Sequence, residues 1–125
     1  MSEERLCLRR IADDTVICDR LVLGESFVQR FMGLMGRASM DEDQGLYLAS
    51  NSIHMFFMRF PIDALFVSRA DAEGRRRVVG VRPDLPPWRG IVMPVRGAEG
   101  VVEMPAGTLA RVGVSVDDEV VFAVV

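Results

Sequence analysis

The sequence contains no lysine, and all 15 of its basic residues are arginines. These arginines are scattered along a chain whose net charge is −3, and the densest basic point is the run 75–77. Three adjacent cations are too few for a nucleic-acid footprint, so we expect no nucleic-acid partner. We attribute the arginine bias to genomic composition, and an arginine surface selected for phosphate binding is the less favoured alternative.

Long hydrophobic runs are also missing. The longest apolar stretch, residues 52–67, is interrupted by Arg59 and Asp63 and stays below the roughly 18 residues that a membrane span requires. The N-terminal residues are acidic and lack the hydrophobic segment of a secretory signal. We therefore expect a cytoplasmic protein with no membrane partner, unless a leader was removed.

Cysteine is scarce, with only Cys7 and Cys18 in the chain. Two cysteines cannot form a disulfide framework, and their spacing is not that of a zinc site. A hairpin turn at residues 12–13 would place them opposite each other, whereas a turn at 13–14 would not. We expect free, structural thiols in a reducing compartment.

The chain has 125 residues, half of them hydrophobic, which suits one domain with one core over residues 1–125. Alternating apolar residues and turn signals predict short strands at 6–11, 15–22, 46–49, 52–59, 62–68, 75–82, 100–104 and 120–125. Two short helices are expected, one from the capping residue Ser26 to Gly36, the other over 106–112. The predicted fold is mainly β, an antiparallel sandwich or barrel-like domain with two short helices, α+β by count.

The stretch 52–67 is predicted to organise the domain. Pro61 lacks the N–H that a ladder needs, so it should separate two strands. Both strands are apolar on both faces, which predicts central strands that are covered on both sides. In the second strand, Asp63 and Leu65 should point to the face opposite to Ala64. Spacing on the predicted elements assigns eight side chains to the core: Phe27, Phe31, Leu34, Phe56, Leu65, Phe66, Val101 and Leu109.

Five polar or amphipathic side chains in apolar or proline-rich segments are candidate ligand-binding residues: His54, Arg59, Asp63, Trp88 and Glu103. As a general base, His54 would need an orienting carboxylate, for which Asp63 and Glu103 are available. A metal site needs about three protein ligands, and His54 is the only histidine, so we expect no metal and no cofactor. A core histidine bonded to a backbone carbonyl is the favoured interpretation.

The other candidates also have two interpretations each. Arg59 either pairs with Asp63 across the bend at Pro61, which is favoured, or binds an anion in a pocket. Trp88 either caps the core, which is favoured, or forms the wall of a site. Glu103 either accepts hydrogen bonds from amides at the start of the following helix, which is favoured, or acts as an acid in a pocket.

Several segments of the chain carry a family resemblance. FMGLMGR at 31–37, SIHMFFMRFPIDALFV at 52–67, LPPWRG at 85–90 and VVEMPAGT at 101–108 occur in this order, followed by GVSVDDEVVF near the end. Together they resemble the bacterial and archaeal domain of unknown function 192 family, from about Cys18 to Phe122. The specific part is the block from His54 to Asp63. The resemblance implies a compact, mostly β sandwich or barrel with short helices, and no agreed activity.

The chain departs from this family at two places. Relatives often carry a cysteine just before the Ser-Ile-His segment, where this chain has Ser50, so a thiol role there does not carry over. Relatives also tend to have Gly-Asp in the last turn, where this chain has Asp117-Asp118. Glycine tolerates positive φ more readily than aspartate does, so this turn is less certain.

Three functions remain open at this level. The first is a small binding module for a polar or anionic small molecule, with a shallow pocket near His54, Arg59, Trp88 and Glu103. The second is a hydrolase or lyase that uses His54 with Asp63 or Glu103. The third is a structural or partner-binding domain without a pocket. The enzyme ranks below the binding module, because the sequence contains no nucleophile elbow, phosphate-binding glycine loop or zinc-protease motif. The sequence does not indicate an oligomeric state.

Overall fold

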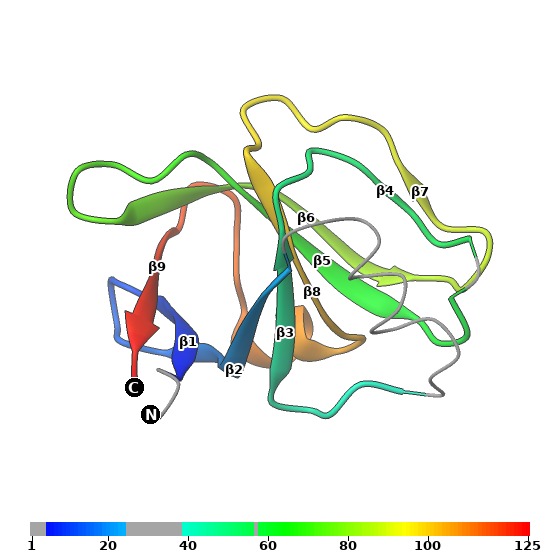
Figure 1. Cartoon of the computed structure of the whole chain (residues 1–125), viewed down its shortest axis with the longest axis horizontal. Helices are drawn as coiled ribbons and strands as arrows, with labels where there is room; N and C mark the ends of the chain where they lie inside the picture. Colours follow the sequence, from blue (N-terminus) through cyan, green and yellow to red (C-terminus); the bar gives the residue numbers. More distant parts are fainter. Residues whose placement is uncertain (1–4, 25–38, 57) are drawn as a thin grey trace.

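The computed structural model describes residues 5–24, 39–56 and 58–125 and is dominated by strands. Seven strands build one sheet: β1 Leu6–Arg10, β2 Val16–Gly24, β3 Gln44–Leu48, β5 Ile62–Val67, β6 Arg75–Leu85, β8 Gly100–Pro105 and β9 Glu119–Val124. This sheet closes into a barrel in the order β1-β2-β3-β8-β5-β6-β9 (Figure 1). Two further strands, β4 (Ile53–His54) and β7 (Ile91–Val92), form a separate small sheet. The described helix is α2, Thr108–Val112.

The barrel closes because its first and last strands pair. β1 and β9 run antiparallel, from Leu6 opposite Val124 to Arg10 opposite Val120. The pairs in the ring are antiparallel except β2–β3, which is parallel. A parallel pair needs a long crossover connection, and the chain from 25 to 43 supplies its length. The barrel-like alternative is therefore confirmed, and the two-sheet sandwich is wrong.

The inside of the barrel is filled by one apolar cluster, which we call the barrel core. It contains Leu8, Ile17, Cys18, Leu21, Leu65, Val67, Val78, Val102, Met104, Leu109, Val114 and Val120. Seven short strands leave an interior that side chains can fill completely, so the cluster is a packed core and not a channel.

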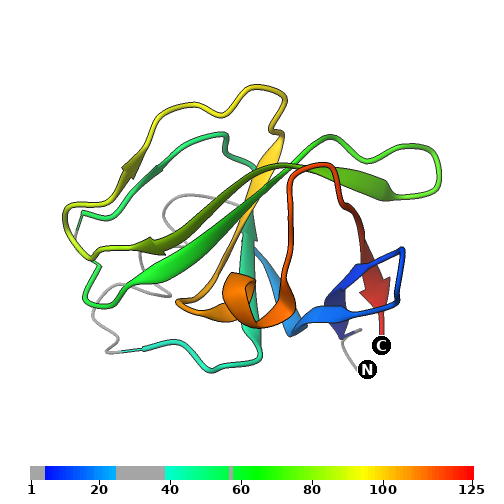
Figure 2. The same ribbon diagram turned by 180° about the vertical axis from the view of Figure 1, so that it is seen from behind.

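A second cluster, the lateral core, lies against the outer surface of the barrel wall. Its members are Met40, Leu46, Leu48, Ile53, Met55, Met58, Phe60, Ile62, Ala64, Phe66, Leu85, Val92, Val95 and Val101. Ile53 and Val92 come from the β4–β7 pair, whereas Phe66 and Val101 come from the barrel strands β5 and β8. The small sheet thus covers the barrel wall, and we call it the covering sheet. Figure 2 shows the same pair of strands outside the barrel from behind.

Strand β5 is buried on both sides, as predicted. Ala64 and Phe66 face the lateral core, and Leu65 and Val67 face the barrel core. The strand predicted at 52–59 is present only as β4, Ile53–His54, so its predicted length is wrong. The chain turns after His54, and the Met58 N–H donates to the Met55 carbonyl oxygen at 3.1 Å. The sequence analysis also missed β7.

The predicted helix at 106–112 is confirmed in shortened form as α2. Gly107 precedes it at φ 98°, and Gly113 ends it at φ 75° with its N–H donating to the Leu109 carbonyl oxygen at 2.8 Å. The other predicted helix lies outside the described residues, with the predicted core residues Phe27, Phe31 and Leu34. No helix in 5–24, 39–56 or 58–125 is long and apolar enough to span a membrane.

The remaining core predictions have a mixed outcome. Leu65, Phe66, Val101 and Leu109 are buried, as predicted. Phe56 is 46% exposed, so its assignment is wrong. The physical reason is the turn after β4, which places Phe56 on the solvent side of the covering sheet.

The two cysteines are buried and free. The ladder places Leu8, and not Cys7, opposite Cys18. Burial raises the pKa of the Cys18 thiol to about 12. A thiol that stays protonated at neutral pH is a poor nucleophile, so Cys18 is a packing residue.

The last turn contains a non-glycine residue in the left-handed region. Asp117 adopts φ 79°. Its N–H donates to the Val78 carbonyl oxygen at 2.8 Å, which fixes this backbone conformation. Aspartate here carries a left-handed strain that glycine would avoid.

Candidate functional site

The covering sheet is joined through the backbone of Met55. Its N–H donates to the Gly90 carbonyl oxygen at 2.8 Å, and its carbonyl oxygen accepts the N–H of Trp88 at 2.9 Å. The same oxygen accepts the N–H of Met58 at 3.1 Å. The Met55 side chain is fully buried in the lateral core. One residue therefore fixes both the turn that follows β4 and the proline-rich loop that precedes β7.

Gly90 is required by this arrangement. A Cβ at this position would lie 2.6 Å from Cγ of Met55 and 2.9 Å from the carbonyl oxygen of Pro86. The same Pro86 oxygen accepts the Gly90 N–H at 3.0 Å, so the backbone has little room to move away. Glycine permits this close approach because it has no side chain.

Trp88 adopts an unusual backbone conformation at the end of the proline-rich loop. Its φ is 67°, and its side chain is 53% exposed. A left-handed conformation costs a non-glycine residue about 1 kcal/mol or more, so the surrounding hydrogen bonds must hold it. The indole is thus presented to solvent at a fixed place beside Met55.

The solvent side of the covering sheet is apolar. His54 pairs with Ile91 across the ladder, whereas Ile53 pairs with Val92 on the buried side. Phe56 lies on the same side, because its ring packs against that of His54. Trp88 and Met93 are exposed residues of the segment that contains Ile91. We call this surface the exposed face, formed by His54, Phe56, Trp88, Ile91 and Met93.

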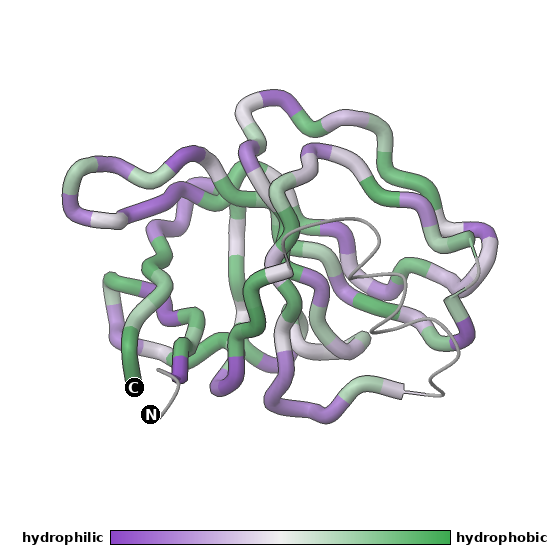
Figure 3. The backbone as a smooth tube through the Cα atoms, viewed as in Figure 1, coloured by the Kyte–Doolittle hydropathy of each residue, from purple (hydrophilic) through white to green (hydrophobic). Residues whose placement is uncertain are grey.

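The large apolar side chains of the exposed face project strongly into solvent. Phe56 is 46% exposed, Ile91 57% and Met93 74%. The His54 ring packs on Phe56, with centroids 5.0 Å apart and planes tilted by 35°. Figure 3 shows the backbone through β7 as one of the hydrophobic stretches at the outside of the fold. Clustered exposed apolar side chains indicate an interaction surface more often than isolated ones do.

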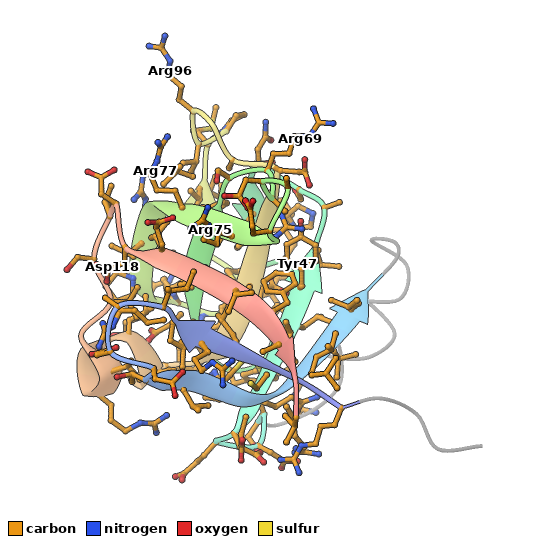
Figure 4. All side chains as sticks on the ribbon, turned by 90° about the vertical axis from the view of Figure 1, so that its left-hand side faces the viewer. Tyr47, Arg69, Arg75, Arg77, Arg96 and Asp118 are labelled. Atoms are coloured by element: carbon orange, nitrogen blue, oxygen red, sulfur yellow. The ribbon has the colours of Figure 1, made fainter. Side chains whose placement is uncertain are left out.

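The segments that form the exposed face contain positively charged residues. The segments that contribute to it, 44–62 and 85–98, contain Arg59, Arg89 and Arg96 and no acidic residue, in a chain of net charge −3. Arg59 and Arg89 are exposed. Arg96 projects away from the fold beyond β7 (Figure 4). The charged residues within these two segments are therefore all positive, and the acidic residues Asp84 and Glu99 adjoin the second segment.

The arginines at the neighbouring end of the barrel are different. Nε of Arg75 lies 3.0 Å from the Asp71 carboxylate, and Nε of Arg77 lies 3.7 Å from that of Asp117. Hydrogen bonds from the backbone and side chain of Arg75 hold the pKa of Asp71 below its usual value. Figure 4 shows Arg75 and Arg77 on this end. Their charges are balanced locally by these carboxylates.

Asp63 is a structural carboxylate. It is fully buried, and its oxygens accept the N–H groups of Asp84 at 2.8 Å, Gly107 at 3.1 Å and Leu109 at 2.8 Å. Backbone donors of this kind stabilise a buried carboxylate. Asp63 thereby fixes the start of α2, which is the capping role that the sequence analysis favoured for Glu103.

Glu103 is also fully buried, but it points the other way. It lies opposite Ala64 in the ladder and so faces the lateral core, whereas Asp63 lies opposite Met104 and faces the barrel core. His54 leaves the covering sheet on the side away from the lateral core. The ladder thus directs His54, Asp63 and Glu103 into three different surroundings.

A family model decides the classification of the chain. The model of the domain of unknown function 192 family, described as "Uncharacterized ACR", matches residues 11–122. The chain belongs to this family. A UPF0127 protein of Thermococcus sibiricus (strain DSM 12597 / MM 739) is 32% identical over 106 residues, which cover 81% of this chain and 64% of that relative. The chain thus spans less than two thirds of the length of this relative.

Two crystal structures have the same fold as this family member. A protein from Sinorhizobium meliloti 1021, provisionally described as a transcription regulator, matches with a TM-score of 0.72 and 27% identity. The match covers 97% of this chain and 94% of that protein. A protein of unknown function from Novosphingobium aromaticivorans DSM 12444 matches with a TM-score of 0.70 and 22% identity, over 93% and 82% of the two chains.

In this family member, the five predicted site residues differ in burial. His54 is half-buried on β4, and Arg59 and Trp88 are exposed. Asp63 and Glu103 are inside. The described residues contain no group of three or more histidine, cysteine or acidic side chains that could hold a metal ion.

The sequence analysis missed Ile91, Met93 and Arg89 as members of this surface. A signal was present in the run of three apolar residues from Ile91 to Met93, between Gly90 and Pro94. It was too short to predict a strand from the sequence alone.

Proposed function

We propose that the domain is a binding module for an anionic small molecule with an apolar part, and that the ligand binds at the exposed face. The observation that carries this proposal is the combination of exposed apolar side chains with arginines in segments that lack any acidic residue. The first part offers contact with a hydrocarbon or ring, and the second offers attraction for an anion.

The conformation of Trp88 supports this location. Strained backbone persists only where the surroundings enforce it, and strained residues are common at functional sites. Trp88 has a strained φ of 67°, but its indole is half exposed. The strain therefore does not serve to bury the side chain completely. A rigidly presented indole is a suitable apolar wall for a ligand.

The arginines support the charge of the proposed ligand. Arg59 and Arg89 are exposed close to the two strands of the covering sheet. A guanidinium group can donate two parallel hydrogen bonds to a carboxylate or phosphate and keeps its charge at any physiological pH. Each of the two segments therefore supplies a guanidinium group for an anionic ligand.

The two other functions have less support. An enzyme that uses His54 requires an orienting carboxylate, but Asp63 binds three backbone N–H groups inside the barrel. A purely structural domain does not account for the strained, half-exposed Trp88. The provisional description of the Sinorhizobium protein as a transcription regulator makes nucleic acid a competing anion, which the experiment includes.

Trp88 is the only tryptophan, so its fluorescence reports on the proposed site. We expect dihexanoyl phosphatidate, titrated as a monomer, to shift the emission to shorter wavelength and to saturate. Dihexanoyl phosphatidylcholine and inorganic phosphate should have little effect, because each offers only one of the two required features. A short single-stranded DNA is the fourth probe.

The double variant Arg59→Gln, Arg89→Gln should weaken phosphatidate binding about tenfold or more, because each charge-assisted contact is worth about 1.5–3 kcal/mol. Arg77→Gln, at the end of the barrel, is the matched control and should bind as the unaltered chain does. An unchanged spectrum with phosphatidate, or equal affinity of the double variant, contradicts the proposal. Preferential binding of DNA contradicts the ligand class.

A further inference from the structure

We infer that the occupant of the exposed face is the surface of an anionic lipid bilayer, to which the domain binds peripherally. This inference rests on the proposed function and names the source of its ligand. The sequence analysis expected no membrane partner, because the chain has no long apolar run. The inference concerns contact with the surface of a membrane and not a span through it.

The first argument is the kind of apolar side chain that projects furthest. Met93 and Ile91, at 74% and 57% exposure, are more exposed than Phe56 and Trp88 on the same face. Flexible aliphatic chains that stand out from a surface suit insertion among acyl chains. A rigid pocket for a soluble ligand would enclose its apolar residues instead.

The second argument is the arrangement of the amphipathic residues around them. Trp88 precedes Ile91 and Met93 in the chain, and Arg89 and Arg96 flank them on either side. Tryptophan is favoured at the boundary between headgroups and acyl chains, and arginine is attracted to anionic headgroups. The aliphatic side chains that project furthest thus share one segment with the residue types that favour the headgroup region.

The third argument excludes a second copy of the chain as the occupant. A twofold contact through the exposed face would bring Arg89 and Arg96 of the two copies to one interface. The contributing segments hold no carboxylate to separate these charges. Like charges brought together at an interface are strongly unfavourable.

A nucleic acid fits the exposed face less well than a bilayer does. Bases are bound without sequence preference by stacking on aromatic rings along a positive groove. Here the most exposed side chains are aliphatic, and only Phe56 and Trp88 offer ring surfaces. The aliphatic pair would gain nothing from a stacked base, but it gains from transfer out of water into hydrocarbon.

Vesicle co-sedimentation tests the inference. We expect the chain to sediment with vesicles of phosphatidylcholine that contain phosphatidylglycerol and to remain in the supernatant with phosphatidylcholine alone. Added salt should release it, and brominated acyl chains should quench Trp88 emission. The variant Ile91→Ser, Met93→Ser should bind at least about tenfold more weakly, because two aliphatic contacts are lost. Arg77→Gln is the matched control and should bind normally.

Each contrary result has a distinct meaning. Binding of monomeric phosphatidate without binding of vesicles overturns the inference and leaves the proposed function standing, whereas failure of both probes overturns both. Vesicle binding that is equal in Ile91→Ser, Met93→Ser overturns the inference, because it would be adsorption by charge alone. Self-association through the exposed face, or tighter binding to DNA than to vesicles, overturns it as well. Circular dichroism shows whether the variant keeps its fold.

Discussion

The barrel and the covering sheet use the same alternation of side chains for different purposes. In the barrel, β5 and β8 are buried on both sides, and each side faces a core. In the covering sheet, Ile53 and Val92 are buried, but Ile91 on the other side is exposed. The comparison indicates that side chains of the barrel strands contribute more to stability than those on the solvent side of the covering sheet.

Charged residues differ between the two regions in the same way. In the barrel, Asp63 is buried and accepts three backbone hydrogen bonds, so its charge stabilises the fold. In the covering layer, Arg59 and Arg89 are exposed within segments that lack a carboxylate. Substitutions in the two regions should therefore separate stability from binding.

The largest loss of stability is expected from a substitution on β5, where the barrel wall contributes to the lateral core. Phe66 is fully buried on β5, so Phe66→Ala should lower the free energy of unfolding by about 3–5 kcal/mol, through lost burial and a cavity. Phe56→Ala, on the exposed face, is the matched control and should cost less than about 1 kcal/mol. Urea denaturation measures both. A cost below about 1 kcal/mol for Phe66→Ala would contradict the assignment.

The second largest loss of stability is expected at Asp63, the buried carboxylate of the barrel. Asp63→Asn should lower the free energy of unfolding by about 2–4 kcal/mol, because the amide group turns a donor toward backbone N–H groups. Asp84→Asn, at an exposed position with φ 54°, is the control and should be nearly neutral, since asparagine tolerates this conformation. Equal stability of the two variants in chemical denaturation would argue against the structural role of Asp63.

An intermediate loss of stability is expected at Gly90, whose backbone bonds to that of Met55 in the covering sheet. Gly90→Ala should cost about 1–3 kcal/mol, because the new methyl group collides with Met55 and with the Pro86 carbonyl. Gly74→Ala places its methyl group in open space and pays only about 1 kcal/mol for its positive φ. Thermal unfolding compares the two. A smaller loss for Gly90→Ala than for Gly74→Ala would show that the close approach is not a constraint.

A smaller gain is expected from relieving backbone strain at the end of the barrel. Asp117→Gly should raise the free energy of unfolding by about 0.5–1 kcal/mol, because glycine adopts φ 79° without strain. The same change at Trp88 would relieve the strain of the covering layer but remove its indole. Asp117→Gly should leave phosphatidate binding unchanged, and a loss of stability would disprove the strain argument.

The smallest effect on stability is expected at the exposed face. Ile91→Ser, Met93→Ser should change the free energy of unfolding by no more than about 0.5 kcal/mol per substitution, since both side chains project into water. Denaturation in urea gives this value, and vesicle sedimentation of the same sample gives the affinity. A large loss of stability would mean that these side chains pack on the barrel, and it would remove the contrast between the two regions.

Much of the barrel could be predicted from the sequence because its strands carry their own pattern. The buried run from Ile62 to Val67 and the break at Pro61 follow from apolar alternation and from the missing proline N–H. Closure of the sheet could not be predicted, since it depends on pairing between β1 and β9 at opposite ends of the chain. The parallel contact between β2 and β3 is equally non-local.

The candidate site was harder to predict than the fold. His54 and Trp88 were selected for their chemistry, and the structure places both beside Met55. Asp63 and Glu103 were selected for the same reason, but a one-residue offset in the ladder between β5 and β8 sends them to opposite faces. Such an offset is set by strand register, which has no local signature in the sequence.

The pairing of β1 with β9 also has a consequence for the order of events during synthesis. Leu6 meets Val124, so synthesis must reach β9 before β1 finds this neighbour. Until then the strands that will enclose the barrel core expose apolar surface, which makes the nascent chain dependent on late closure and prone to aggregation. The N–H of Val125 donates to the Arg5 carbonyl oxygen at 2.8 Å, so these two residues lie side by side. A circular permutant that joins them and opens the chain in the turn at Gly74 would make β9 and β1 a local hairpin, and closure would become an early event of folding.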